Sequence, residues 1–172
     1  MVIKTIFSGS SLSSSSNEAF SLLDSSSFGE KKENKVMYTP IEALYLVKSK
    51  KMEVYKKNSL ISFDKILSLI KKKDKDTEEK LSVFQDMRRK GFVLKSALKF
   101  GADFRVYSKG DKPIKSHSRW LLYISRHNNS IKWQDFSAKV RVANSTRKNL
   151  LLAILDDEDD VTYYEVSWKK IN

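Results

Sequence analysis

Six consecutive charged residues, Lys71 to Asp76, interrupt the hydrophobic pattern just before the middle of the chain. The segment has no apolar side chain that could anchor it to a core, and Asp76 or Thr77 then provides a new helix-start signal. We therefore expect a linker here, with an N-terminal domain over residues 1–74 and a C-terminal domain over residues 75–172. The alternative is a continuous helical connection between the two parts.

The N-terminal part contains two helices with clear start signals. The first has Thr39 as N-cap, Pro40 at the first helical position and Glu42 three residues after the cap, which together form a capping box. The second is expected from Phe63 to Lys72, with Ser62 as its N-cap. Residues 2–7 and 52–55 are strand candidates, and residues 18–23 form a short amphipathic turn. These elements predict a small mixed α/β domain.

The C-terminal part is richer in strands. A helix that starts at Asp76 or Thr77 is expected to stop at Gly91, because glycine readily adopts the left-handed conformation that ends helices. A second amphipathic segment runs from Trp133 to about Arg147, with Trp133, Phe136, Val140 and Ala143 on one side. The strand candidates are residues 92–94, 104–107, 120–124, 150–155 and 161–168. We expect an α/β (α+β) fold class, with a central mixed sheet in this domain.

The chain is strongly basic, since 33 Lys and Arg residues against 21 Asp and Glu residues give a net charge of +12. Such an excess attracts polyanions, most often nucleic acid. A lysine-rich proteome would produce the same excess without that partner. The acids are clustered in one block, Asp156, Asp157, Glu158, Asp159 and Asp160, so we expect a polarised surface.

Several classes of protein are disfavoured by what the sequence lacks. It has no cysteine, which excludes disulfides and thiolate metal sites. Its apolar runs are shorter than a membrane span, and its serine-rich start lacks the apolar core of a secretory signal. We therefore expect a cytoplasmic protein with no membrane partner.

One stretch, Phe104 to Ile124, has the pattern of a hairpin with a basic turn. Its first arm ends near Tyr107, and His117 lies just before the apolar run of the second arm. From these residues alone, a basic surface hairpin with a packed tyrosine and a solvated histidine is the simpler interpretation. The other histidine, His127, is expected in a solvated loop.

Three ordered motifs resemble those of the archaeal tRNA-splicing endonuclease family. A D-x-R-x-x-G-[FY]-x-[VL]-[KR] pattern occupies Asp86 to Lys95, and K-[FY]-G-A-D-F occupies Lys99 to Phe104. An R-V-A-x-S-x-R-K motif spans Arg141 to Lys148, and "IEALYLV" gives a weaker match in the N-terminal part. The resemblance covers about residues 35–172. The chain departs from the family pattern at Ala97, where glycine is usual, and at Asn144, where histidine is common.

The resemblance implies that Tyr107, His117 and Lys148 are catalytic, with His117 opening the strand after the turn. It also implies a substrate, precursor tRNA with a bulge–helix–bulge motif, and no cofactor. The ribose 2′-hydroxyl attacks the adjacent phosphodiester, leaving a 2′,3′-cyclic phosphate and a 5′-hydroxyl.

The three side-chain types suit this reaction without a metal. An imidazole, with an unperturbed pKa of about 6.5, suits the acid that protonates the leaving oxygen, and an ammonium suits the stabilising cation. A free tyrosine titrates near pH 10, so Tyr107 needs nearby cations to act as the base. It could instead only position the 2′-hydroxyl, and the sequence leaves both roles open.

The resemblance further implies that Arg141 and Trp168 clamp a bulge base, reaching in from a neighbouring subunit of a four-unit assembly. Alternatively, Arg141 forms an ion pair on its helix and Trp168 is a core residue of an edge strand. The resemblance places the acidic block, Asp156 to Asp160, in a basic cleft of another subunit. A solvated turn and a weak divalent-ion site remain the alternatives for that block. The assembly is either a homotetramer or a heterotetramer with a second endonuclease subunit.

Two other functions compete with the metal-independent RNA endonuclease. One is a non-catalytic RNA-binding or structural subunit of the same assembly, against which the complete Tyr–His–Lys set argues. The other is a metal-dependent nuclease that uses Asp86, Asp103 or the acidic block, although the sequence has no compact carboxylate–lysine metal motif.

Overall fold

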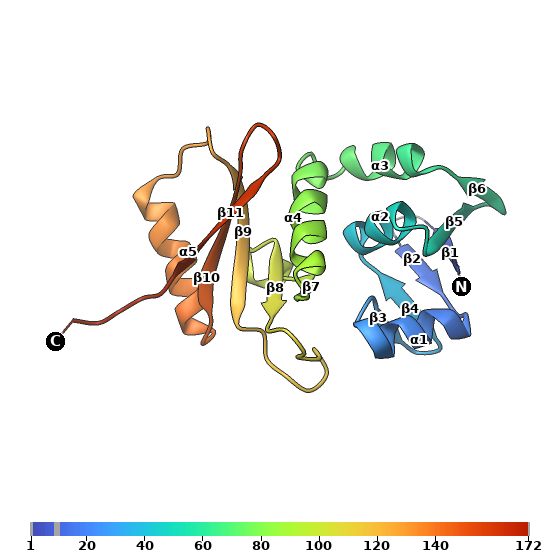
Figure 1. The fold of residues 1–172 in the computed structure, drawn as a ribbon, viewed down its shortest axis with the longest axis horizontal. Coiled ribbons are helices and arrows are strands. Elements are labelled where there is room, and N and C mark those ends of the chain that lie inside the picture. Colours follow the sequence, from blue (N-terminus) through green and yellow to red (C-terminus); the bar gives the residue numbers. More distant parts are fainter. Residues whose placement is uncertain (1, 9–10, 172) are drawn as a thin grey trace. The chain divides into compact units, whose positions relative to one another are not determined.

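The computed structural model describes residues 2–8 and 11–171. The chain divides into two compact units, with the division between Leu81 and Ser82. Each unit is built on its own mixed sheet (Figure 1), which confirms the expected α+β fold class. Among the described residues, no helix combines the length and the apolar character needed to cross a membrane.

The N-terminal unit has a six-stranded sheet in the order β3-β4-β2-β1-β5-β6, in which only β1 and β5 pair in parallel among the described strands. The capping box of Thr39 and Glu42 is confirmed at the start of α2. The turn expected at residues 18–23 is wrong, because a full helix begins after the N-cap Ser16. The elements are β1 (Ile3–Ser8), β2 (Ser11–Ser14), α1 (Asn17–Ser26), β3 (Glu30–Lys32), β4 (Lys35–Tyr38), α2 (Pro40–Lys48), β5 (Met52–Lys56), β6 (Ser59–Ile61) and α3 (Phe63–Lys71).

The C-terminal unit has a five-stranded sheet in the order β11-β10-β9-β8-β7. Its central pair, β9 and β10, is parallel and is joined by α5, whereas the other pairs are antiparallel. The elements are α4 (Thr77–Arg89, which begins before the unit boundary), β7 (Val93–Ser96), the 3-10 turn η1 (Leu98–Phe100), β8 (Phe104–Tyr107), β9 (Trp120–Arg126), α5 (Trp133–Ser145), β10 (Asn149–Leu155) and β11 (Val161–Val166).

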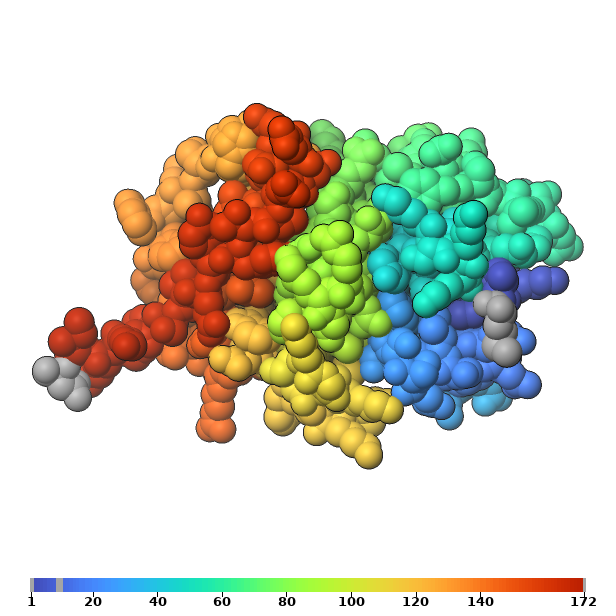
Figure 2. Space-filling view, viewed as in Figure 1, coloured from blue at the N-terminus to red at the C-terminus, as the bar shows by residue number. Residues whose placement is uncertain are grey.

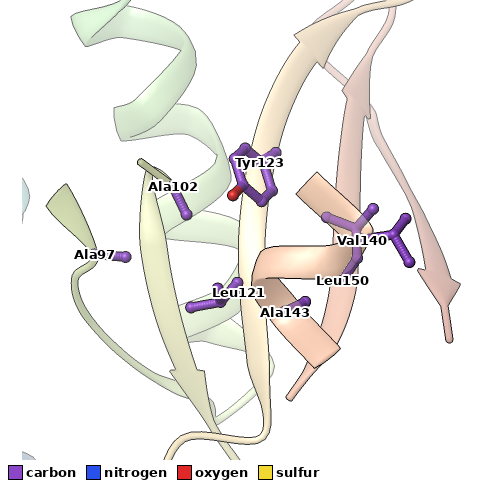
Figure 3. Packing of buried hydrophobic residues seen from close by; sticks show 7 residues of the cluster. All are labelled: Ala97, Ala102, Leu121, Tyr123, Val140, Ala143 and Leu150. Atoms are coloured by element: carbon purple, nitrogen blue, oxygen red, sulfur yellow. The ribbon is translucent and has the colours of Figure 1, made fainter. Parts of the chain in front are cut away.

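Helices cover the C-terminal sheet on both faces, with α5 on one and α4 on the other (Figure 1). On the α5 face, Val140 and Ala143 pack against side chains of β9 and β10 (Figure 3). On the α4 face, the rings of Phe84 and Phe104 lie 5.7 Å apart. The prediction that Trp133 belongs to the buried side of α5 is wrong. Its side chain is 81% exposed, because it lies at the first residue of the helix, beyond the sheet-facing turns.

The predicted stop of α4 at Gly91 is confirmed. Gly91 has φ +90°, and the Phe92 amide donates to the Met87 carbonyl at 3.0 Å, closing the turn after the helix. This turn redirects the chain from α4 into β7 at the edge of the sheet.

Asp86 connects the end of α4 to the edge strand β11. The Tyr163 hydroxyl donates to Asp86 Oδ2 at 2.8 Å, and the Lys90 ammonium lies 4.9 Å from the Tyr163 ring centroid. Burial raises the pKa of Asp86, but hydrogen bonds from Lys90, Tyr163 and Arg89 outweigh it, so the pKa is lowered overall. Burial, followed by the bond to Asp86, raises the pKa of Tyr163. Asp86, the aspartate that opens the D-x-R motif, therefore has a structural role within this unit.

Replacing Tyr163 with Phe should lower the free energy of unfolding by about 1.5–3 kcal/mol, the usual value of a hydrogen bond to a charged group. Urea unfolding measures the loss. The matched control is Tyr164→Phe, since Tyr164 is 56% exposed and its side chain lies on the opposite face of β11.

The hydrogen bond between Tyr163 and Asp86 also predicts that the stability of the protein depends on pH. The pKa of Asp86 is lower in the folded state than its ordinary value of 3.8. Its contribution to the free energy of unfolding is therefore complete above pH 3.8 and is lost as the pH falls through the folded-state pKa. Equal unfolding free energies for wild type and Tyr163→Phe would contradict the structural role.

Candidate active site

Tyr107 and Lys148 lie at the same edge of the C-terminal sheet, on either side of β9. Trp120, the first residue of β9, pairs with Val106 of β8 on one side and with Asn149 of β10 on the other. Tyr107 follows Val106, and Lys148 precedes Asn149. Two strand spacings of about 4.8 Å separate their backbones by about 10 Å. In Figure 1 the end of β8 and the starts of β9 and β10 meet at this edge.

The register also decides which face these residues share. Arg105 and Leu150 both pair with Leu121, which belongs to the core under α5. Side chains two residues apart on a strand lie on the same face. Tyr107, two residues after Arg105, and Lys148, two residues before Leu150, therefore both belong to the α5 face.

His117 reaches the same edge from the loop between β8 and β9. The expectation that it opens the strand is wrong, since β9 begins three residues later at Trp120. The end of the loop is nevertheless anchored, because Ser118 is buried and the Arg119 amide donates to the Val106 carbonyl at 2.9 Å. His117 itself is exposed next to this anchored segment.

The R-V-A-x-S-x-R-K motif folds into the last turns of α5 and the turn into β10. Arg147 has φ +57°, and the Lys148 amide donates to the Ala143 carbonyl at 2.9 Å, which ends the helix. The Lys148 ammonium donates to the Thr146 carbonyl at 2.9 Å and lies 5.8 Å from the Phe100 ring centroid. The local fold therefore holds this cation in one place.

The charge of Lys148 is influenced by a neighbour that the sequence analysis missed. Burial, followed by repulsion from the Arg105 guanidinium, lowers the pKa of Lys148. Arg105 Nε donates to the Ser96 carbonyl at 3.0 Å, and Lys95, buried at 5%, pairs with Arg105 in the ladder. The signal was present in the sequence, because Arg105 precedes Tyr107 by two residues on a strand.

Tyr107 is 3% exposed, so its ring is fixed within the α5 face. Lys148 and Arg105 supply positive charge on this face. The site can thus combine a fixed phenol, two fixed cations and an exposed imidazole.

The two residues expected to clamp a base, Arg141 and Trp168, are both exposed. Arg141, on α5, forms no ion pair with any described residue. The predicted strand end at residue 168 is wrong, since β11 ends at Val166. Trp168 is 53% exposed in the segment that follows, which extends from the unit in Figure 2.

The acidic block, Asp156 to Asp160, forms the turn between β10 and β11. It lies at the other end of β10, about 26 Å from Lys148, because eight residue steps at about 3.3 Å each separate Lys148 from Asp156. The Asp156 Oδ1 atom accepts from the amides of Glu158 and Asp160 at 2.9 Å each, so the turn is locally structured. Within one chain, the block therefore cannot join the catalytic edge.

Two basic residues lie beside the acidic turn. Arg126 contacts Asp159 Oδ1 at 3.2 Å, and His127 Nε2 lies 3.8 Å from Asp157 Oδ2. The expectation that His127 lies in a solvated loop is confirmed, since it lies in a turn and its side chain is 45% exposed. Within residues 2–8 and 11–171, no group of three or more His, Asp or Glu side chains has the arrangement of a metal site.

Two family models match the chain. Residues 77–163 match the model described as tRNA intron endonuclease, catalytic C-terminal domain, and residues 3–67 match tRNA intron endonuclease, N-terminal domain. The catalytic-domain match includes the sheet edge described above.

Several archaeal proteins named tRNA-splicing endonuclease are similar over most of their length. The one from Pyrococcus abyssi is 39% identical over 170 residues, which are 98% of each chain. The one from Methanothermobacter thermautotrophicus is 37% identical over 143 residues, 83% of each chain. The one from Nanoarchaeum equitans is 39% identical over 136 residues, 76% of this chain and 87% of the relative. The chain belongs to the tRNA-splicing endonuclease family, as its motifs predicted.

Proposed function

We propose that this protein is a metal-independent RNA endonuclease that excises introns from precursor tRNA at bulge–helix–bulge junctions. Membership of the family supports the substrate class. The observation that carries the proposal is the convergence of Tyr107, His117 and Lys148 on one edge of the C-terminal sheet. Together these three side chains would supply a base, an acid and a cation, so the reaction needs no metal.

In the proposed reaction, the 2′-oxygen forms a bond to phosphorus while the bond from phosphorus to the 5′-oxygen breaks. Tyr107 takes the proton of the 2′-hydroxyl, or orients that hydroxyl, and His117 gives a proton to the 5′-oxygen. Lys148 stabilises the negative charge that grows on the non-bridging oxygens. The products are a 2′,3′-cyclic phosphate and a 5′-hydroxyl end.

The +12 charge of the chain favours binding of the RNA backbone, and the exposed Lys109, Lys112 and Lys115 lie in the loop before His117. We further propose that Arg141 and Trp168 of a neighbouring subunit clamp a bulge base, by stacking and cation–π contact. Their exposure is compatible with action in another subunit's site.

We propose a four-unit assembly, either of this chain alone or of this chain with a second endonuclease subunit. The edge strand β11 has one unpaired side in the sheet order, and edge pairing between subunits would cover it. The acidic turn, distant from its own catalytic edge, is available to bind a basic surface of another subunit.

Replacing His117 with Ala should leave RNA binding nearly unchanged and slow cleavage by about 100- to 10,000-fold, the usual effect of losing a general acid. Single-turnover cleavage of a bulge–helix–bulge RNA measures it, and added imidazole should restore part of the rate. A wild-type rate for His117→Ala would refute the acid role.

Wild-type cleavage should continue in excess EDTA and leave a cyclic phosphate. A product with a 5′-phosphate would indicate a metal-dependent nuclease. RNA binding without any cleavage would indicate the non-catalytic subunit instead.

Replacing Trp168 with Ala should weaken the binding of bulged RNA by about 1–3 kcal/mol, the usual value of one base–aromatic stack, and Arg141→Ala should have a similar effect. Titration with a 2′-deoxy substrate measures the loss. Trp133→Ala is the matched control, because Trp133 is also exposed in this unit. If Trp168→Ala instead unfolds the chain, its role is structural.

Changing the five residues Asp156 to Asp160 to Asn or Gln should reduce the four-unit assembly to inactive dimers. The chain is positively charged overall, so its self-association requires opposite charge at the contacts. Light scattering measures the mass, and high salt should partly mimic the change.

The control for this variant neutralises two exposed acids of the N-terminal unit, Glu30 and Glu33. That change should leave the mass unchanged. An intact tetramer after neutralisation of Asp156 to Asp160 would show that the block is a solvated turn.

A further inference from the structure

Arg105 has unused hydrogen-bonding capacity in a half-buried position. Its Nε atom donates to the Ser96 carbonyl at 3.0 Å. In the described part of the chain this is the one hydrogen bond of the side chain, and Arg105 forms no ion pair there. A guanidinium carries five N–H donors, so both Nη groups of Arg105 are left for a ligand. The bond at Nε fixes the plane of the fork and therefore the direction of those donors.

Two other cations lie near Arg105. It lies on the α5 face with Tyr107, next to Lys95 in the ladder, and its charge acts on Lys148. Among described groups, no carboxylate contributes to the pKa of Lys148. Holding two partly buried cations close together costs free energy unless an anion lies near both. The local sequence thus maintains an unfavourable charge arrangement that an anionic ligand would relieve.

Geometry suits a phosphate in that role. Arginine binds phosphate through two parallel N–H groups, whereas lysine acts as a point charge. Arg105 lies on β8 and Lys148 directly precedes β10, and each donates to a backbone carbonyl that fixes it. A phosphate held between them would lie at the edge that Tyr107 and His117 also reach.

We propose that the Nη groups of Arg105 bind a non-bridging oxygen of the scissile phosphate, making Arg105 a second catalytic cation beside Lys148. This inference rests on the proposed RNA cleavage and adds one residue to its transition-state contacts. Because charge on the non-bridging oxygens grows during the attack, the contact strengthens in the transition state. Its loss should therefore lower the rate of the chemical step more than substrate affinity.

The test compares Arg105→Gln and Arg105→Lys with wild type in single-turnover cleavage at saturating RNA. Arg105→Gln should cleave about 100- to 1,000-fold more slowly, the usual effect of removing one such donor, while a 2′-deoxy substrate binds nearly as well. Arg105→Lys should recover part of the rate, since it restores the charge but not the fork. Arg89→Gln is the matched control, because it removes the same charge from an 80% exposed side chain of α4.

A phosphorothioate at the scissile phosphate distinguishes a direct contact between Arg105 and that phosphate from a purely structural role of Arg105. In wild type, sulfur in place of the contacted non-bridging oxygen should slow cleavage, and in Arg105→Gln that stereospecific penalty should largely disappear. Equal penalties in both proteins would overturn the proposal and assign Arg105 a structural role between β7 and β8. Cleavage by wild type in the same assay shows that the proposed function itself holds.

A second measurement applies even if wild type cleaves no RNA. Inorganic phosphate is titrated into the full chain, and the NMR signal of the Arg105 Nε–H group is followed, with Arg89 as the reference. A saturable shift at Arg105 alone supports the anion site, and the absence of a shift overturns it. If wild type cleaves no RNA, the proposed cleavage fails in the RNA assay. The phosphate titration still decides whether Arg105 binds an anion.

Discussion

The candidate site depends on the parallel pairing of β9 and β10 in the C-terminal sheet. Because α5 carries the chain back across the sheet between them, both strands begin at the same edge. The antiparallel strand β8 ends at that edge. Residues from three separate segments, Tyr107, His117 and Lys148, therefore meet there. An antiparallel β9–β10 pair would have put Lys148 at the opposite edge, with the acidic turn.

The same topology separates two charged regions of the C-terminal unit. The length of β10 places the acidic turn about 26 Å from Lys148, so the negative block does not neutralise the positive charge of Lys148. Arg126 and His127 belong to the acidic end, and Arg105 and Lys95 belong to the catalytic end. One end is thus suited to bind a polyanion and the other to bind a basic surface, which is the polarity that an assembly around RNA requires.

The site also illustrates how the fold maintains like charges near one another. Carbonyl groups of Ser96 and Thr146 accept from Arg105 and Lys148, which satisfies one donor of each cation without neutralising it. Elsewhere in the unit, Asp86 balances Lys90 and Arg89, and that cluster ties β11 to α4. Charges that are paired thus stabilise the sheet, whereas Arg105 and Lys148 form no ion pair among the described residues and would be available to the proposed phosphate ligand.

Local patterns in the sequence determined many elements and the identity of the family. The capping box at Thr39, the stop at Gly91 and the apolar runs of β9 and β10 are short-range signals, because capping and strand formation depend on neighbouring residues. The motifs likewise pointed to the family. The short polar strand β2 was missed, since Leu12 is its one apolar residue and its stability comes from pairing with β1 and β4.

Only the tertiary structure decided which residues surround Lys148. Alternation along β8 assigns Arg105 to the face of Tyr107, but which face α5 covers depends on contacts between segments distant in sequence. The loop position of His117 and the distance of the acidic turn follow from where strands start and end in the sheet, and the exposure of Trp133 follows from where α5 begins. Sequence periodicity specifies a residue's face within its own strand, whereas the neighbours across the sheet are set by register and connection.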